Sequence, residues 1–256
     1  NTTFLITRDG VVVVDTRVTP NEAEKVLVEI RKQTNLAIVY TINTHYHGDH
    51  TFGNQIFQSS GPIIAHENVR RSLSGDSGKD HLESFKSRNI HELDKTVVTP
   101  PNMVFKDEME IFLGGYSLRL IHVRGHTDGD LFIYIKELKT LITGDLVVYK
   151  KIPDMSDAYI EDWISAMNKL GNLDAEIYIP GHGDPGGKPV LLAMRHYLFN
   201  LKTLVLKGLE EGKSLKETQD AARPVLIKKY KSWENLDLID ANIQRAYLEY
   251  SLRKDS

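Results

Sequence analysis

The chain has no cysteine among its 256 residues. Disulfide bonds, thiolate metal ligands and a cysteine nucleophile are therefore excluded. Long apolar runs are also absent, because stretches such as Val11–Val14 fall far short of the roughly 18 apolar residues that a membrane span needs. An excess of one charge is lacking too, since 32 basic and 35 acidic residues leave a net charge of −3. We therefore expect a small-molecule partner, with no nucleic acid and no membrane.

The composition present is that of a globular protein, with 41% hydrophobic and 26% charged residues. At about 150 residues per domain, the length predicts one large domain with an appendage. Strand signals stop after Pro189, so residues 1–189 are predicted to form the main domain and residues 190–256 a C-terminal helical extension. The chain begins with Asn1 rather than Met, which slightly favours an exported or periplasmic protein. Its oligomeric state is left open.

Strand and helix patterns alternate in the first third, which predicts an α/β architecture. Asp9-Gly10 is a tight-turn signal between two apolar runs, so residues 4–7 and 11–14 are predicted to form a hairpin. A helix is expected over 19–30, with strands over 36–42 and 62–65. Farther along, the pattern predicts strands at 109–113, 116–123, 131–135, 140–143 and 176–179 and helices at 160–170, 190–209 and 238–252.

Residues 67–100 interrupt this pattern. They are polar and rich in Ser, Lys, Asp and His, and we interpret them as an insertion that is helical, mobile or covering. In the tail, Ser214-Leu215-Lys216-Glu217 resembles a capping box and predicts the start of another helix.

Three histidines and one aspartate crowd the segment Thr44-His45-Tyr46-His47-Gly48-Asp49-His50, directly after an apolar strand. Neutral imidazole and carboxylate are ligands that suit zinc and similar metals. In an extended turn His45 and His47 share a face, whereas Asp49 and His50 begin a helix and face a second point nearby. The spacing therefore favours two adjacent metals over one. The alternative is a His-rich surface loop.

Three further candidates follow predicted strands, each beside glycine: His126 in Gly125-His126-Thr127, Asp145 in Thr143-Gly144-Asp145 and His182 in Pro180-Gly181-His182-Gly183. Functional sites of α/β sheets gather at strand ends, and glycine lets the backbone crowd a site. The other histidines are placed outside the ligand set. Among them, His66 ends a strand and could approach the site, His122 and His196 are expected to be structural, and His81 and His91 are expected to be solvated.

Together these motifs resemble the metallo-β-lactamase superfamily, as does Val12-Val13-Val14-Asp15-Thr16, a strand that ends in an aspartate. The resemblance runs from Asn1 to about Pro189. It implies an α/β fold, the αββα four-layer metallo-β-lactamase sandwich, in which two sheets pack face to face between outer helices. Here that sandwich would be followed by a C-terminal helical appendage.

The resemblance also implies roles for the candidate residues. It assigns His45, His47 and His126 to a first metal and Asp49, His50 and His182 to a second, with Asp145 bridging both. The implied cofactor is two Zn²⁺, with Fe or Mn as alternatives. Such a pair generates a shared hydroxide that attacks carbon or phosphorus, and Asp49 is expected to help orient it. Asp15 is a candidate acceptor for an imidazole N–H, with capping of the next turn as the alternative.

The residue at position 145 indicates which members of the superfamily the chain resembles most. Some β-lactamases of the superfamily have Cys at this position and another subclass has Ser. Asp is the pattern of the superfamily's thioesterases, lactonases, phosphodiesterases and related hydrolases. The helical tail also resembles that of bacterial hydrolases found near sulfur-oxidation and quinoprotein gene clusters.

We therefore predict a dinuclear zinc hydrolase that cleaves a small carbonyl substrate, namely a thioester, an ester, a lactone or, weakly, a β-lactam. The alternative is a phosphodiesterase that uses the same metals on a small phosphodiester; an iron redox protein and a structural metal module rank below both. Candidate substrate contacts are Tyr46, between two ligands, and Tyr149, Lys150 and Lys151, after the bridging aspartate. Alternatively, Tyr46 only packs against its neighbours, and residues 149–151 form a basic loop exposed to solvent.

Overall fold

The computed structural model describes residues 1–87 and 92–254. The chain divides into two compact units. The first contains residues 1–123 and 129–144, and the second contains residues 124–128 and 145–256. The predicted boundary at residue 189 stays a prediction. His91, which we expected in solvent, lies outside the described residues.

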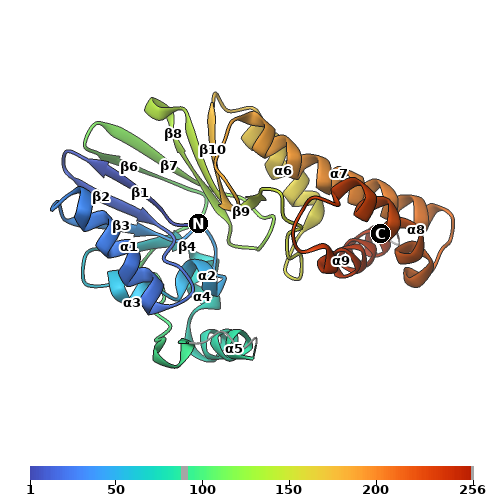
Figure 1. The fold of residues 1–256 in the computed structure, drawn as a ribbon, viewed down its shortest axis with the longest axis horizontal. Coiled ribbons are helices and arrows are strands. Elements are labelled where there is room, and N and C mark those ends of the chain that lie inside the picture. Colours follow the sequence, from blue (N-terminus) through green and yellow to red (C-terminus); the bar gives the residue numbers. More distant parts are fainter. Residues whose placement is uncertain (88–91, 255–256) are drawn as a thin grey trace. The chain divides into compact units, whose positions relative to one another are not determined.

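The first sheet has the order β1-β2-β3-β4-β5 (Figure 1). Its strands are β1 (Thr3–Thr7), β2 (Gly10–Val14), β3 (Ile38–Ile42), β4 (Ile63–His66) and β5 (Met103–Phe105). β1 and β2 form the predicted antiparallel hairpin. From β2 to β5 neighbouring strands are parallel, so their carboxyl ends lie at one edge. That edge receives Asp15 and the His-rich segment 44–50.

The second sheet has the order β10-β9-β8-β7-β6. Its strands are β6 (Glu108–Leu113), β7 (Tyr116–His122), β8 (Leu131–Ile135), β9 (Thr140–Val148) and β10 (Ile177–His182). The predicted hairpins β6–β7 and β8–β9 are confirmed. However, β9 and β10 extend farther than predicted, so Asp145 lies within β9 and His182 ends β10. The Gly-Asp pair at 144–145 resembled a turn, but β9 is buried along its whole length and continues through it.

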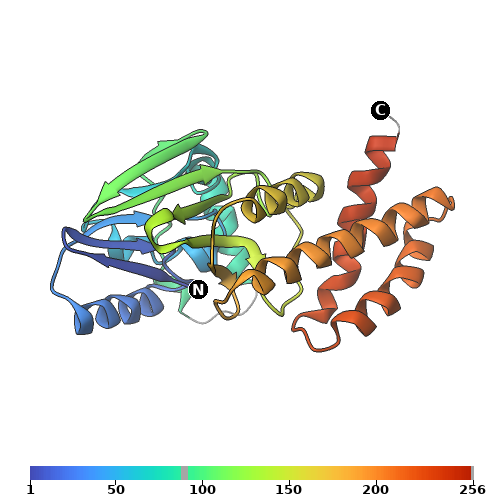
Figure 2. The same cartoon turned by 90° about the horizontal axis from the view of Figure 1, so that it is seen from above.

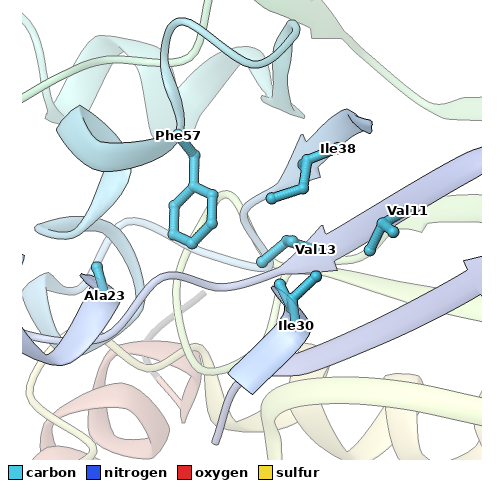
Figure 3. Packing of buried hydrophobic residues seen from close by; sticks show 6 residues of the cluster. All are labelled: Val11, Val13, Ala23, Ile30, Ile38 and Phe57. Atoms are coloured by element: carbon cyan, nitrogen blue, oxygen red, sulfur yellow. The ribbon is translucent and has the colours of Figure 1, made fainter. Parts of the chain in front are cut away.

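A hydrophobic core lies between the first sheet and helices α1 (Pro20–Gln33) and α3 (Asn54–Phe57) (Figure 3). Its buried members are Val11, Val13, Ala23, Ile30, Ile38 and Phe57. The Thr19 hydroxyl caps α1 by accepting from the Glu22 N–H at 3.2 Å, a usual role of Thr before the first turn of a helix. β2 is buried throughout, which explains why its sequence is an unbroken valine run rather than an alternating one.

The described part of the polar insertion is largely helical. It contains α4 (Glu67–Ser72), α5 (Gly75–Lys86) and the short 3₁₀ helix η1 (Leu93–Lys95). Leu82 and Phe85 of α5 pack with Phe52 and Leu93 in a small buried cluster. A few apolar side chains therefore anchor α5 to the first unit in spite of its polar composition.

The second unit contains α6 (Ile160–Gly171), α7 (Lys188–Glu210), α8 (Leu215–Tyr230), the 3₁₀ helix η3 (Leu236–Leu238) and α9 (Ile239–Lys254). Helices α7, α8 and α9 pack against one another (Figure 2), which confirms the helical tail. Ser214 and Glu217 form the predicted capping box at the start of α8. None of the helices described combines the length and apolarity that a bilayer crossing requires.

Candidate metal centre

Four of the predicted ligands lie in the His-rich turn, residues 44–50, which follows β3 and runs into α2 (Gly48–Thr51). The His45 ring contacts the other two imidazoles of this turn, with centroids 4.8 Å from His47 and 4.2 Å from His50. Gly48 permits the turn, because a Cβ at this position would lie 2.3 Å from the Phe52 ring. The three imidazoles are therefore gathered as their spacing predicted.

The side chains of this turn form pairs of potential donors. Ligand atoms of His45 lie within 4.8 Å of those of His47 and of His50, and the same limit holds between Asp49 and His50. Asp49 Oδ2 is 3.4 Å from His50 Nε2. His45 and His50 are buried, whereas the Asp49 side chain is 33% exposed. The first unit thus presents buried imidazoles together with one carboxylate that water can reach.

The Asp15 carboxylate makes hydrogen bonds with Thr44 and His50 of the His-rich turn. Its Oδ1 accepts from the Thr44 N–H at 2.8 Å, and its Oδ2 accepts from the Thr44 hydroxyl at 2.7 Å. Oδ2 also lies 2.7 Å from Nδ1 of His50. Because a carboxylate can only accept, Nδ1 carries the proton, and the unprotonated nitrogen is Nε2, the atom that would bind a metal. The acceptor role expected for Asp15 is confirmed.

The other three predicted ligands, His126, Asp145 and His182, belong to the second unit. Asp145 Oδ2 lies 3.3 Å from Nε2 of His182 and 3.7 Å from Nε2 of His126. Gly183 follows His182 with φ of +89°, and a Cβ there would lie 2.3 Å from the carbonyl oxygen of Tyr149. A residue with a side chain would force the segments apart. One carboxylate oxygen therefore lies near a nitrogen of each of two imidazoles.

The donor chemistry of both groups fits zinc. Imidazole nitrogens and carboxylate oxygens are common ligands of catalytic zinc, and the chain offers no thiolate. Five histidines and two aspartates exceed the four ligands of a closed structural zinc site. The donor set therefore suits more than one ion.

His81, which we expected in solvent, lies among aromatic rings, so that prediction is wrong. Its ring centroid is 5.1 Å from that of Tyr46, 6.0 Å from that of His47 and 5.0 Å from that of Phe85. Leu82 and Phe85 pack α5 against Phe52 and Leu93. His81, which precedes Leu82 on the same helix, is thereby placed beside these rings. This short apolar pair within a polar stretch was the signal that the sequence reasoning missed. Tyr46 contacts two histidine rings, as a packed residue beside the site does.

The candidate substrate contacts after β9 differ in their surroundings. Lys151 forms an ion pair with Glu234, which engages its charge. Lys150 is exposed, and its Nζ lies 5.2 Å from the centroid of the Tyr149 ring. Tyr149 donates its backbone N–H to the carbonyl of His182 at 2.9 Å. Tyr149 and Lys150 therefore remain candidates beside a predicted ligand.

The remaining described histidines have other surroundings. His66 and His122 stack on each other, with centroids 3.6 Å apart and an interplanar angle of 7°. His66 is buried and caps α4 by accepting from the Asn68 N–H at 3.3 Å. His196 is exposed on α7. These contacts agree with the packing roles expected for His122 and give His66 a capping role.

Comparison with known proteins gives a family. Residues 1–182 match the model of the metallo-beta-lactamase superfamily. The chain is 23% identical over 215 residues to the linear primary-alkylsulfatase of Pseudomonas sp. (strain ATCC 19151), covering 69% of this chain and 40% of that protein. It is 27% identical over 185 residues to the beta-lactamase-like protein 2 homolog of Caenorhabditis elegans, covering 72% of this chain and 55% of that protein. The chain thus spans about half, or less, of the length of these two relatives.

A solved structure resembles the whole chain. The metallo-beta-lactamase family protein TTHA1429 from Thermus thermophilus has a TM-score of 0.71 and 21% identity, covering 100% of this chain and 88% of that one. This likeness confirms the expected αββα fold with C-terminal helices. Because the family model matches more than half of the chain, the chain belongs to the metallo-β-lactamase superfamily, whose members are metal-dependent hydrolases.

Proposed function

We propose that the protein is a dinuclear zinc hydrolase. His45, His47 and His126 would hold one ion, Asp49, His50 and His182 would hold the other, and Asp145 would be shared between them. The observation that carries this proposal is the position of Asp145 Oδ2, 3.3 Å from His182 Nε2 and 3.7 Å from His126 Nε2. This oxygen therefore lies beside one histidine of each ligand set. Iron and manganese suit the same donors and are the alternative metals.

The chemistry follows from these residues. When bound, a pair of such ions polarises a carbonyl oxygen and lowers the pKa of a shared water toward neutrality. Asp49 is partly exposed, so its carboxylate can accept a hydrogen bond from the attacking water and orient it. Asp15 keeps the proton of His50 on Nδ1.

The substrate that we propose is a small thioester, ester or lactone, with a β-lactam as a weak substrate. Asp145 stands where the β-lactamase subclasses have Cys or Ser, which supports this choice. Tyr149 and Lys150 offer a hydroxyl and a cation to an anionic group on the substrate. A sulfate ester is the second candidate, because one relative is named a linear primary-alkylsulfatase. A small phosphodiester is the remaining alternative.

The test is a hydrolysis assay of the full chain on thioester, lactone, cephalosporin, alkyl sulfate and bis-aryl phosphodiester substrates, with and without a chelator. We expect zinc-dependent turnover of a carbonyl substrate, and a loss of at least about 100-fold in Asp49→Ala with an unchanged circular dichroism spectrum. His196→Ala, exposed on α7, is the matched control and should keep the wild-type rate. Full activity in Asp49→Ala, or after metal removal, would contradict the mechanism. Turnover of the sulfate or phosphate ester alone would reassign the substrate class.

A further inference from the structure

The C-terminal part of the second unit holds residues 150–161, the segment that follows β9. The Glu234 backbone N–H donates to the carbonyl of Lys150 and its carbonyl accepts from the Ile152 N–H, each at 3.0 Å. Asn242 of α9 is 1% exposed, and its side-chain amide donates to the carbonyl of Pro153 at 2.9 Å. These contacts join residues far apart in sequence, so the tail supports the chain that leaves the strand of Asp145.

Glu249 of α9 caps the start of α6. Tyr159, the N-cap residue of α6, makes no side-chain cap. In its place, Glu249 Oε2 accepts from the Ile160 N–H at 2.7 Å and Oε1 accepts from the Glu161 N–H at 3.1 Å. The Glu249 side chain is only 11% exposed. A carboxylate at this position satisfies two N–H groups that the helix leaves without acceptors and interacts favourably with the helix dipole.

The start of α6 contacts two of the three segments that carry predicted ligands of this unit. The Tyr159 N–H donates to the carbonyl of Gly125, which precedes one ligand, at 2.8 Å. The Trp163 Nε1 donates to the carbonyl of Leu146, which follows another ligand, also at 2.8 Å. The fully buried Trp163 ring also lies 5.4 Å, between centroids, from the ring of His126. A shift at the start of α6 would therefore reach both ligands.

We propose that Glu249 is a positioning residue for the metal centre. It fixes the first turn of α6, and that turn holds the loop of His126 and the strand of Asp145 at their separation. This inference rests on the proposed function, because it requires both side chains to bind metal. Removal of the carboxylate takes the acceptor from two backbone N–H groups in a largely buried place. The turn then has to move or admit water, and the two ligands lose their fixed spacing.

The test compares Glu249→Ala and Glu249→Gln with the wild type in zinc affinity by chelator competition, in the visible spectrum of the cobalt(II)-loaded protein, and in thermal stability. We expect Glu249→Ala to weaken zinc binding by about tenfold or more and to alter the cobalt bands. Glu249→Gln keeps one acceptor oxygen and should recover part of the affinity. The control is Arg223→Ala, which removes the 3.0 Å ion pair with Asp240 between α8 and α9 and should keep wild-type affinity and spectrum.

Two outcomes overturn the inference in distinguishable ways. If Glu249→Ala melts at a lower temperature but binds zinc as tightly as the wild type, with the same cobalt spectrum, Glu249 contributes to stability only. If the wild type binds neither zinc nor cobalt, the proposed function fails and the inference fails with it. Should Glu249→Ala not fold, the same comparison is made with Glu249→Gln.

Discussion

Replacement of Asp15 by asparagine tests how the imidazoles of the first unit are held. Asn has the same shape and tolerates the φ of +61° at this position, so the backbone can stay as it is. The change replaces one acceptor oxygen by an NH₂ group that only donates. The introduced amide has two possible orientations. In the first, the NH₂ group takes the position of Oδ1 and faces the Thr44 N–H, 2.8 Å away. In the second orientation, the NH₂ group takes the position of Oδ2 and faces Nδ1 of His50, 2.7 Å away. Nδ1 must then accept, so the His50 proton moves to Nε2.

The two orientations have different costs. The first sets two buried donors against each other, which costs about 1–3 kcal/mol of folding stability. The second keeps the Thr44 N–H paired, and the Thr44 hydroxyl can turn to accept, but Nε2 of His50 is now protonated. Loss of such an outer hydrogen bond weakens metal binding by about 10- to 100-fold, or about 1.4–2.7 kcal/mol. Because the second orientation leaves fewer groups unpaired, we expect the loss of metal affinity to dominate.

The assay is zinc competition with a chromophoric chelator, combined with urea unfolding of the metal-free protein. Asp15→Asn should shift the competition curve and change the unfolding midpoint little. The control is Asp9→Asn, since the Asp9 side chain is 55% exposed and accepts from the Gly114 N–H at 3.1 Å. An Asp15→Asn variant with wild-type zinc affinity would refute the argument that Asp15 sets the tautomer of His50.

Two further predictions concern stability. In urea unfolding, Gly144→Ala should destabilise the protein more than Gly212→Ala. Both positions have a positive φ, which costs about 1–2 kcal/mol for Ala, but only the Cβ at position 144 would clash, 2.5 Å from the Thr44 hydroxyl oxygen. Equal unfolding midpoints for the two variants would contradict this prediction. Burial raises the pKa of Glu161, but the hydrogen bonds from Lys202 and Tyr250 and the charges of Lys202 and Arg253 together outweigh it, so the pKa is lowered from 4.5. Its stabilisation is therefore full above that value and lost as pH falls through the folded pKa, so the melting temperatures of Glu161→Gln and wild type should converge on acidification; a constant difference would count against the pairing.

Local patterns predicted the parts of the site that depend on neighbouring residues. The alternation of an extended turn is a property of its own backbone, and it brought His45 and His47 together before any tertiary contact was known. Asp15 was predicted through the resemblance to the family, and the parallel pairing of its strand β2 with β3 explains why it lies beside the His-rich turn. The start of α1, expected at residue 19, likewise depends on near neighbours, because the Thr19 hydroxyl accepts from the Glu22 N–H.

Contacts between distant segments were not predictable from local pattern. Glu249 caps α6 from 89 residues away, and nothing near residue 160 indicates its partner. His81 lies in a polar stretch, and only the packing of α5 brings it to the ring of His47. The ends of β9 and β10 were also missed, since glycine beside a polar residue signals a turn unless neighbouring strands keep the segment extended.

The central claim is that Asp145 is shared between two metal ions held by five histidines and Asp49. The most direct test is the zinc content of the dialysed, zinc-loaded protein, measured by elemental mass spectrometry for the wild type and for Asp145→Ala. We predict about two zinc ions per chain in the wild type, and losses at both positions in Asp145→Ala that leave less than about one. A wild type that holds one ion or none, or an Asp145→Ala variant that keeps both, would contradict the account.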